Sequence, residues 1–141
     1  MYLGRYYHRL ESKGRVSLPA KFREALGEGA VITKELDHCL SIFDRLAWEK
    51  KVEAIKSLEF TKQANRNYIR FLTNDAQELE TDGQGRIRIE QTLLAAAHIE
   101  KEVVFVGTND HIEIWDREAY HEYMASVEKQ IEESVEKITN E

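Results

Sequence analysis

The sequence predicts an α+β protein built from two tandem copies of a β module, which share one core and carry flanking helices. The first reason is an internal repeat: residues 11–18 (ESKGRVSL) recur as residues 82–89 (DGQGRIRI), 71 positions later. The second reason is length, because 141 residues leave each half too short for a comfortable core of its own. The third is that short strand-like stretches alternate with amphipathic helical ones.

The repeat continues past this segment with an offset of 72 or 73, so the second half has gained one or two residues. The matching stretches are Asp37-His38 with Asp110-His111, and residues 42–45 with residues 114–117. Two equivalent halves predict a pseudo-symmetric unit, and such symmetry constrains how the surface of the chain is used.

The first module, residues 5–47, is predicted to open with a hairpin of strands 5–10 and 15–18. Both strands alternate in polarity, and Gly14 can supply the positive φ of the turn between them. The hairpin would have one apolar face and one cationic face. The cationic face would expose four basic side chains together: Arg5, Arg9, Lys13 and Arg15.

Pro19 precedes a predicted short helix over residues 20–26, which Gly27 ends. Two more strands, residues 30–33 and 40–43, complete the first module. A helical connection, residues 48–75, follows within a helical pattern that covers residues 46–72.

The second module, residues 76–119, repeats the order of the first. Strands are predicted over residues 77–81, 86–89, 103–106 and 112–115, with a helix over residues 91–98. Residues 120–141 are predicted to form a C-terminal amphipathic helix, whose apolar positions are Tyr120, Met124, Val127, Ile131, Val135 and Ile138. This helix either packs on its own core or also contacts a neighbouring subunit.

Composition indicates a folded protein, with 42% apolar and 33% charged residues. No run approaches the roughly 20 apolar residues of a membrane span, and the N-terminus lacks the apolar region of a signal peptide. Cys39 is the only cysteine, and the interpretation as a buried structural thiol is favoured over a reactive one. The cytoplasm is the expected compartment.

The net charge of −6 is unevenly distributed. Residues 1–23 hold six basic residues and one acidic residue, a net of +5, whereas residues 117–141 carry a net of −4. A polyanion responds to the local potential within about one Debye length, so the N-terminal region remains compatible with nucleic acid.

The doubled Gly-Arg turn followed by an alternating strand resembles the MraZ family of bacterial transcriptional regulators, built from two AbrB-like modules. The first copy, residues 13–23 (KGRVSLPAKFR), is similar to the family signature, as are Leu3-Gly4-x-Tyr6 and the pairs Asp44-Arg45 and Asp116-Arg117. The resemblance covers residues 1–124.

This resemblance implies a cytoplasmic, nucleoid-associated and sequence-specific DNA-binding protein. It also implies a homo-oligomeric ring that binds repeats in a promoter, typically that of its own operon of cell-division and cell-wall genes. The two modules would interleave as swapped hairpins and form one pseudo-dimeric barrel.

The second copy departs from the family pattern. Gln84 replaces the lysine, Glu90 the proline and Leu94 the arginine of the signature. Residues 76–94 carry a net charge of −2, whereas the equivalent residues 5–23 carry +5. We therefore expect most phosphate contacts on the first module.

The expected DNA-binding residues follow from this contrast. A two-stranded ribbon fits the major groove, and Arg15, near the hairpin tip, is the first candidate for contact with a guanine edge. Arg5, Arg9 and Lys13 are better placed for phosphates. Lys21 and Arg23 either contact phosphate or solubilise a helix, and Arg86 either contacts DNA or forms a salt bridge to Asp82 or Glu80. The alternative for the whole face is a solvated strand without a partner.

No catalytic pattern is recognised. The five histidines lack metal-ligand spacing, and the duplicated Asp-His pairs favour a structural role over a metal site or a small hydrolase. We expect no enzyme activity, no cofactor, no metal, no small-molecule substrate and no membrane. The main rival to a DNA-binding regulator is an oligomeric protein-interaction scaffold that has lost DNA binding and uses its acidic C-terminal helix as the partner surface.

Overall fold

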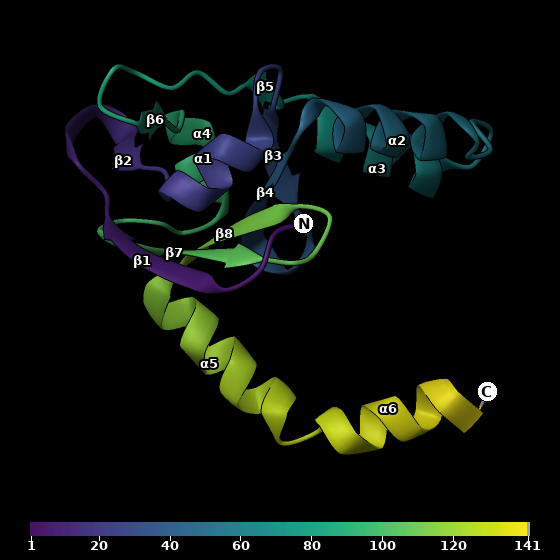
Figure 1. The fold of residues 1–141 in the computed structure, drawn as a ribbon. Helices are drawn as coiled ribbons and strands as arrows, with labels where there is room; N and C mark the ends of the chain where they lie inside the picture. Colours follow the sequence, from purple (N-terminus) through teal and green to yellow (C-terminus); the bar gives the residue numbers. More distant parts are fainter. Residues whose placement is uncertain (141) are drawn as a thin grey trace.

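The computed structural model describes residues 1–140 and confirms the α+β class (Figure 1). Eight strands are all paired antiparallel: β1 (Arg5–Arg9), β2 (Arg15–Ser17), β3 (Val31–Glu35), β4 (Cys39–Phe43), β5 (Gln77–Glu78), β6 (Arg86–Arg88), β7 (Glu102–Gly107) and β8 (Ile112–Asp116). Six α-helices accompany them within these residues: α1 (Ala20–Leu26), α2 (Arg45–Lys56), α3 (Gln63–Thr73), α4 (Gln91–Ala96), α5 (Arg117–Glu128) and α6 (Ile131–Asn140).

Strands from the two halves of the chain interleave. Six strands form one sheet in the order β1-β7-β8-β4-β3-β5, and β2 and β6 form a separate ribbon. Four of the strand pairs join the halves: β1 with β7, β5 with β3, β4 with β8, and β2 with β6. Each half therefore completes the sheets of the other, and the shared core buries more apolar surface than a half of this length could bury alone.

The predicted hairpin of residues 5–10 and 15–18 is wrong in its pairing. β1 pairs with β7 in the large sheet, whereas β2 pairs with β6 in the ribbon. A short turn at residues 12–14 redirects the chain, with Lys13 at φ 62° and Gly14 at φ 74°. The alternation along β1 is as predicted, because Arg5, Tyr7 and Arg9 are exposed while the residues between them are half-buried.

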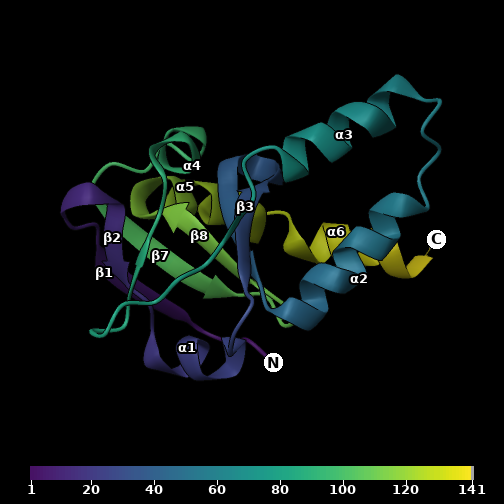
Figure 2. The ribbon, with the colours of Figure 1, turned by 90° about the horizontal axis from the view of Figure 1, so that it is seen from above.

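No pairing among residues 1–140 closes the sheet into a barrel, since β1 and β5 are the two ends of its strand order. The ribbon and the short helices α1 and α4 cover one face of the sheet (Figures 1 and 2). The largest side chains buried between these layers include Phe105, Leu40, Ile42, Ile114 and Leu93. Full burial of such a side chain stabilises the fold by about 1.5–3 kcal/mol each.

Gly14 holds the ribbon close to the second module. The amide of Ile89 donates to the carbonyl oxygen of Gly14 at 2.8 Å, and a Cβ on Gly14 would overlap the carbonyl oxygen of Ile89. A positive φ and this close approach both require glycine here.

Two predicted helices are interrupted. The helical pattern of residues 46–72 divides into α2 and α3, and Arg66 donates from Nη1 to the carbonyl oxygens of Phe60 and Thr61 in the connecting segment, each at 3.0 Å. The predicted C-terminal helix divides into α5 and α6 at residues 129–130. Its last residue, Glu141, and the side chain of Ile138 lie outside what the structure describes.

Asp44 and Asp116, the repeated residues before α2 and α5, cap both helices in the same way. Asp44 accepts from the amide of Ala47 at 2.8 Å, and Asp116 accepts from the amide of Ala119 at 3.0 Å. Among residues 1–140, none of the helices combines the length and apolar character that a membrane span needs.

Candidate nucleic-acid interface

The β2–β6 ribbon has one strand from each module. Val16 lies opposite Ile87 at its centre, and both side chains are buried. Since successive residues of a strand point to opposite faces, the flanking pairs lie on the outer face. One of these pairs is Arg15 opposite Arg88, and the other is Ser17 opposite Arg86.

Arg86 is held by two carboxylates. Its Nε lies 2.9 Å from Oδ2 of Asp82, and its Nη1 lies 3.5 Å from Oε1 of Glu11. Asp82 Oδ1 also accepts from the amides of Gln84 and Arg86, at 2.8 and 3.0 Å. The backbone hydrogen bond from Arg86 is the first of the contacts that lower the pKa of Asp82. Of the two salt bridges expected for Arg86, the one to Asp82 is present.

Arg15 and Arg88 differ from Arg86, because neither forms an ion pair within residues 1–140. Like charges directly opposite each other on a ribbon repel in the absence of a counter-ion. Both arginines border a shallow hollow of about 180 Å³ together with Glu80 and Asp82. The outer face thus concentrates two uncompensated guanidinium groups beside a compensated one.

Three more basic residues of the first module, Lys13, Lys21 and Arg23, lie in the segments next to β2. Lys13 is exposed in the turn before β2, and Lys21 is exposed on α1. Arg23 donates from Nη1 to the carbonyl oxygens of Leu18 and Gly85, both at 3.4 Å. Arg23 therefore joins α1 to the second Gly-Arg turn.

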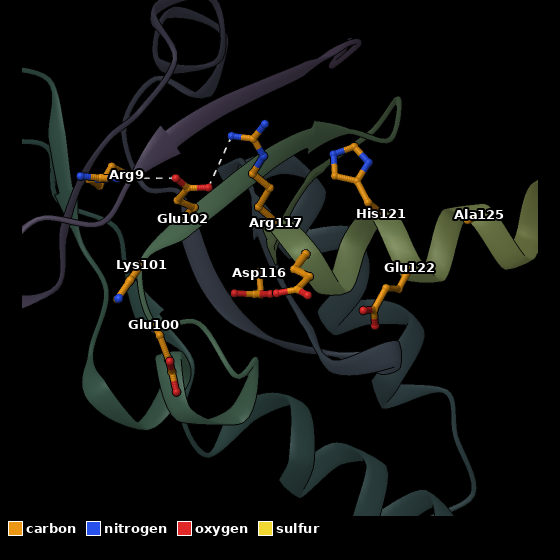
Figure 3. A pocket seen from close by; sticks show the side chains of 10 residues that line it. Arg9, Glu100, Lys101, Glu102, Asp116, Arg117, His121, Glu122 and Ala125 are labelled. Carbon is orange, nitrogen blue, oxygen red and sulfur yellow. Dashed lines mark hydrogen bonds and ion pairs between the residues drawn. The ribbon is translucent and has the colours of Figure 1, made fainter.

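Arg5 and Arg9 lie elsewhere, on β1, where α5 packs against their face of the strand. The Arg5 guanidinium lies 5.8 Å from the ring centre of Tyr120. Arg9 and Arg117 both pair with Glu102, at 3.6 and 3.4 Å (Figure 3). The predicted single ribbon of four basic residues is not formed: Arg5 and Arg9 belong to the large sheet, whereas Arg15 belongs to the β2–β6 ribbon and Lys13 to the turn before it.

The aromatic contacts on β1 strengthen this separation. Tyr7 stacks on His121 of α5, with ring centres 5.7 Å apart, and the Arg117 guanidinium lies 4.6 Å from the centre of the Tyr7 ring. Cation–π contacts of this kind contribute roughly 0.5–1 kcal/mol at exposed sites. The outer face of β1 consequently has a structural partner within the chain.

Arg88 was missed by the sequence reasoning. The alternation Arg86-Ile87-Arg88 could have identified it, because it matches Arg15-Val16-Ser17 and places Arg88 on the same face as Arg86. What the sequence does not give is the partner strand. Only the β2–β6 register places Arg88 beside Arg15.

The histidines, carboxylates and single cysteine are the other chemically reactive side chains. No three His, Cys, Asp or Glu side chains within residues 1–140 are arranged to hold a metal ion. Cys39 is buried and donates from Sγ to the carbonyl oxygen of Leu36 at 3.4 Å. Burial, followed by the negative charge of Glu113, raises the pKa of this thiol well above its usual range.

Interleaved halves that share a two-stranded ribbon define the chain as a duplicated, pseudo-symmetric α+β protein. A family model described as "MraZ protein, putative antitoxin-like" matches it twice, over residues 1–71 and 72–140. The chain belongs to the MraZ family.

Full-length relatives agree with this family assignment. One from Caldanaerobacter subterraneus subsp. tengcongensis, named transcriptional regulator MraZ, is 44% identical over 140 residues, which covers 99% of this chain and 98% of the relative. Relatives of the same name from Carboxydothermus hydrogenoformans and Desulforamulus reducens are 41% and 39% identical over 140 residues, covering 99% of this chain and 98% and 99% of their own lengths. These relatives are named as regulators of transcription.

Proposed function

We propose that this chain is a sequence-specific DNA-binding transcriptional regulator that reads DNA with the β2–β6 ribbon. The observation that carries the proposal is the pair Arg15 and Arg88, two guanidinium groups opposite each other without a carboxylate partner in residues 1–140. The names of the full-length relatives support regulation of transcription.

A ribbon of two strands fits the major groove of DNA, and arginine donates two hydrogen bonds to O6 and N7 of guanine. Arg15 and Arg88 would contact base edges. Lys13 and Lys21 would contact the flanking phosphates, which fix the register without reading sequence. Arg86 and Arg23 would hold the ribbon and its turns in shape, because both already bond within the chain.

Arg5 and Arg9 are proposed as outlying phosphate contacts. The side chain of Arg9 is 77% exposed despite its ion pair with Glu102, so it can reach a backbone that passes the edge of the sheet. An exposed pair of this kind contributes little to stability and exchanges readily for a phosphate.

One ribbon is a weak binder, since nonspecific protein–DNA complexes have dissociation constants of about 10⁻⁴ to 10⁻⁶ M at physiological salt. We propose that the chain forms a homo-oligomeric ring that places several ribbons on repeated promoter sites, which raises the effective concentration of each further contact. The target would be the promoter of its own cell-division and cell-wall operon, in a cytoplasmic, nucleoid-associated complex. The two interleaved sheets would correspond to a swapped-hairpin barrel of the AbrB-like type.

The test is a titration of a duplex carrying the upstream repeats of its own gene, at several salt concentrations. Arg15→Ala and Arg88→Ala should each weaken specific binding about ten- to a hundredfold and reduce the difference between the repeat duplex and a scrambled duplex. Lys62→Ala, between α2 and α3, is the matched loss of one exposed positive charge and should leave both measurements unchanged.

The rival class, a protein-interaction scaffold without DNA binding, predicts another result. It gives no preference for the repeat duplex at any salt concentration. That outcome would refute the DNA-binding proposal, whereas a salt-dependent preference that Arg15→Ala and Arg88→Ala do not change would refute the role of the ribbon.

A further inference from the structure

Two helical arms of opposite charge extend from the body on the same side (Figure 1). The basic arm is α2–α3, and residues 45–75 hold seven basic and four acidic residues. The acidic arm is α5–α6, and residues 117–141 hold three basic and seven acidic residues. Figures 1 and 2 show α6 leading away from both sheets.

The acidic arm keeps large apolar side chains in solvent. Ile131 is 47% exposed, and Tyr123 is 41% exposed although its ring packs against Trp115, with ring centres 5.1 Å apart. Ile131 belongs to neither buried cluster of the described residues, although it continues the apolar spacing of α5. Glu128 and Glu132 flank it and are exposed. An amphipathic helix with its apolar residues exposed is typical of a surface that packs against another helix.

The basic arm offers a complementary surface. Leu46, Lys50 and Ala54 follow one another at intervals of four along α2 and so form one stripe, and Leu46 is 63% exposed. This stripe borders a hollow of about 440 Å³, which Phe43 and Lys51 also line. Three carboxylates line it too, and each already has a partner within the chain: Glu35 with Ser41, Asp44 with Tyr2, and Asp110 with His111. Lys50 makes no ion pair with any residue in 1–140.

We infer that the acidic arm of one copy of this chain docks on the basic arm of a second copy. Ile131 would enter the hollow beside Leu46, and Glu132 would pair with Lys50. The inference deepens the ring described under Proposed function and rests on it, because it assigns the surfaces by which neighbouring subunits meet.

The basic arm of a second copy is a better partner for the acidic arm than either another acidic arm or the basic arm of the same copy. Two acidic arms would bring like charges together, which opposes a symmetric contact of α6 with α6. Within one copy the two arms do not meet: α6 and α2 are well apart in Figure 1. A contact between two different surfaces repeats from copy to copy and generates a closed ring when the rotation permits.

The assigned contact leaves the DNA-binding surface free. The β2–β6 ribbon lies at the end of the molecule opposite the tip of the α2–α3 arm (Figure 1). Assembly through the arms would therefore present the ribbons of successive subunits together.

A cysteine pair tests the contact directly. In the full chain, Leu46→Cys with Ile131→Cys should give a ladder of disulfide-linked multimers after mild oxidation, because the native Cys39 is buried. Either substitution alone is the control and should give no species larger than a dimer. A disulfide confined to one chain, or no ladder from the pair, would overturn the inference.

A charge exchange gives an independent measurement of the same contact, with sedimentation equilibrium as the readout. Glu132→Lys and Lys50→Glu should each raise the protein concentration at half-assembly about tenfold, and the double variant should return it to within about threefold of the starting value. Glu24→Lys, an exposed reversal on α1, is the matched control and should have no effect.

The outcomes separate the inference from the proposed function. A starting protein that remains a monomer at every concentration, with and without repeat DNA, would overturn both the ring and the contact. An assembly that tolerates both single reversals, or that the double variant fails to restore, would overturn the contact and leave the ring standing. If both proposals hold, Glu132→Lys monomers should still prefer the repeat duplex over a scrambled one, but should bind it more weakly than the starting protein because avidity is lost.

Discussion

The two Gly-Arg turns share a glycine with positive φ but differ in their ionic surroundings. Gly14 and Gly85 adopt φ angles of 74° and 77°. Arg15, after the first glycine, has no carboxylate partner in residues 1–140, whereas Arg86, after the second, pairs with Asp82 and Glu11. The duplicated turn has thus kept its positive-φ glycine, while in the described part of the chain only the second of its two arginines is held by carboxylates.

This difference shows that equivalent residues of a pseudo-symmetric protein can have different roles, one in binding and the other in holding the fold. A free arginine can exchange water for a guanine edge, whereas a paired one must first lose its carboxylates. The second module still supplies Arg88, which stands beside Arg15 on the ribbon. The second module therefore contributes two arginines to the ribbon. Arg86 is held by carboxylates and fixes the turn, whereas Arg88 adds a second guanidinium, unpaired within residues 1–140, beside Arg15.

The largest expected effect comes from the glycines. Gly14→Ala should destabilise the protein by about 2–4 kcal/mol, because the new Cβ would combine an unfavourable φ with overlap of the Ile89 carbonyl. Gly85→Ala should cost only about 1–2 kcal/mol, since its Cβ would meet the movable guanidinium of Arg23. Urea denaturation measures both, and equal losses would contradict the asymmetry.

The arginines give the next largest effect. Arg15→Ala should weaken binding of repeat DNA by about 1–3 kcal/mol, whereas Arg86→Ala should weaken it by less than about 1 kcal/mol. The double variant Asp82→Asn with Glu11→Gln tests the difference between Arg15 and Arg86, because it removes both carboxylate partners of Arg86. The side-chain oxygen of Asn at position 82 can still accept from the backbone amides of the turn. We expect this double variant to bind DNA more tightly and with a steeper salt dependence. Unchanged binding would show that Arg86 cannot reach the duplex.

The repeated Asp-His pairs provide a pH test. His38 is exposed at φ 60°, whereas its counterpart His111 is half-buried, with Nδ1 2.7 Å from Asp110 and Nε2 3.9 Å from Glu113. Burial lowers the pKa of His111, but its interactions with the carboxylates of Glu113 and Asp110 outweigh burial and raise the pKa above its usual value.

A raised pKa means that protonated His111 stabilises the fold below its unfolded pKa, and that this contribution is lost as the pH rises through the folded pKa. The free energy of unfolding of the starting protein should therefore contain a component that falls from pH 6 to pH 8. His111→Gln should remove this component, and His38→Gln should retain it. Parallel pH profiles for the two variants would contradict the assignment.

The smallest effect concerns β1, whose basic residues have no counterpart on the short β5. Glu102→Gln breaks the ion pairs to Arg9 and Arg117, both on exposed side chains, and should cost less than about 1 kcal/mol in thermal unfolding. DNA binding should strengthen slightly if Arg9 contacts phosphate. Unchanged binding would place Arg9 outside the complex.

The sequence by itself determined the duplication, the α+β class, the order of the strands and helices, and the exposed face of β1. These features depend on local spacing: a repeated turn, alternation with period two, and capping residues such as Asp44 and Asp116. The family also followed from the sequence, because the doubled turn is distinctive.

Only the tertiary structure decided which strands pair, and with that which arginines stand together. Local alternation is the same whether β2 pairs with β1 or with β6, so the pattern could not separate Arg5 and Arg9 from Arg15 or bring Arg88 to it. The pairing of β2 with β6 depends on two contacts between the halves. Val16 and Ile87 are buried opposite each other, and Gly14 approaches Ile89 closely. Contacts between residues 69 to 73 positions apart are set by packing of the whole core, which no local window contains.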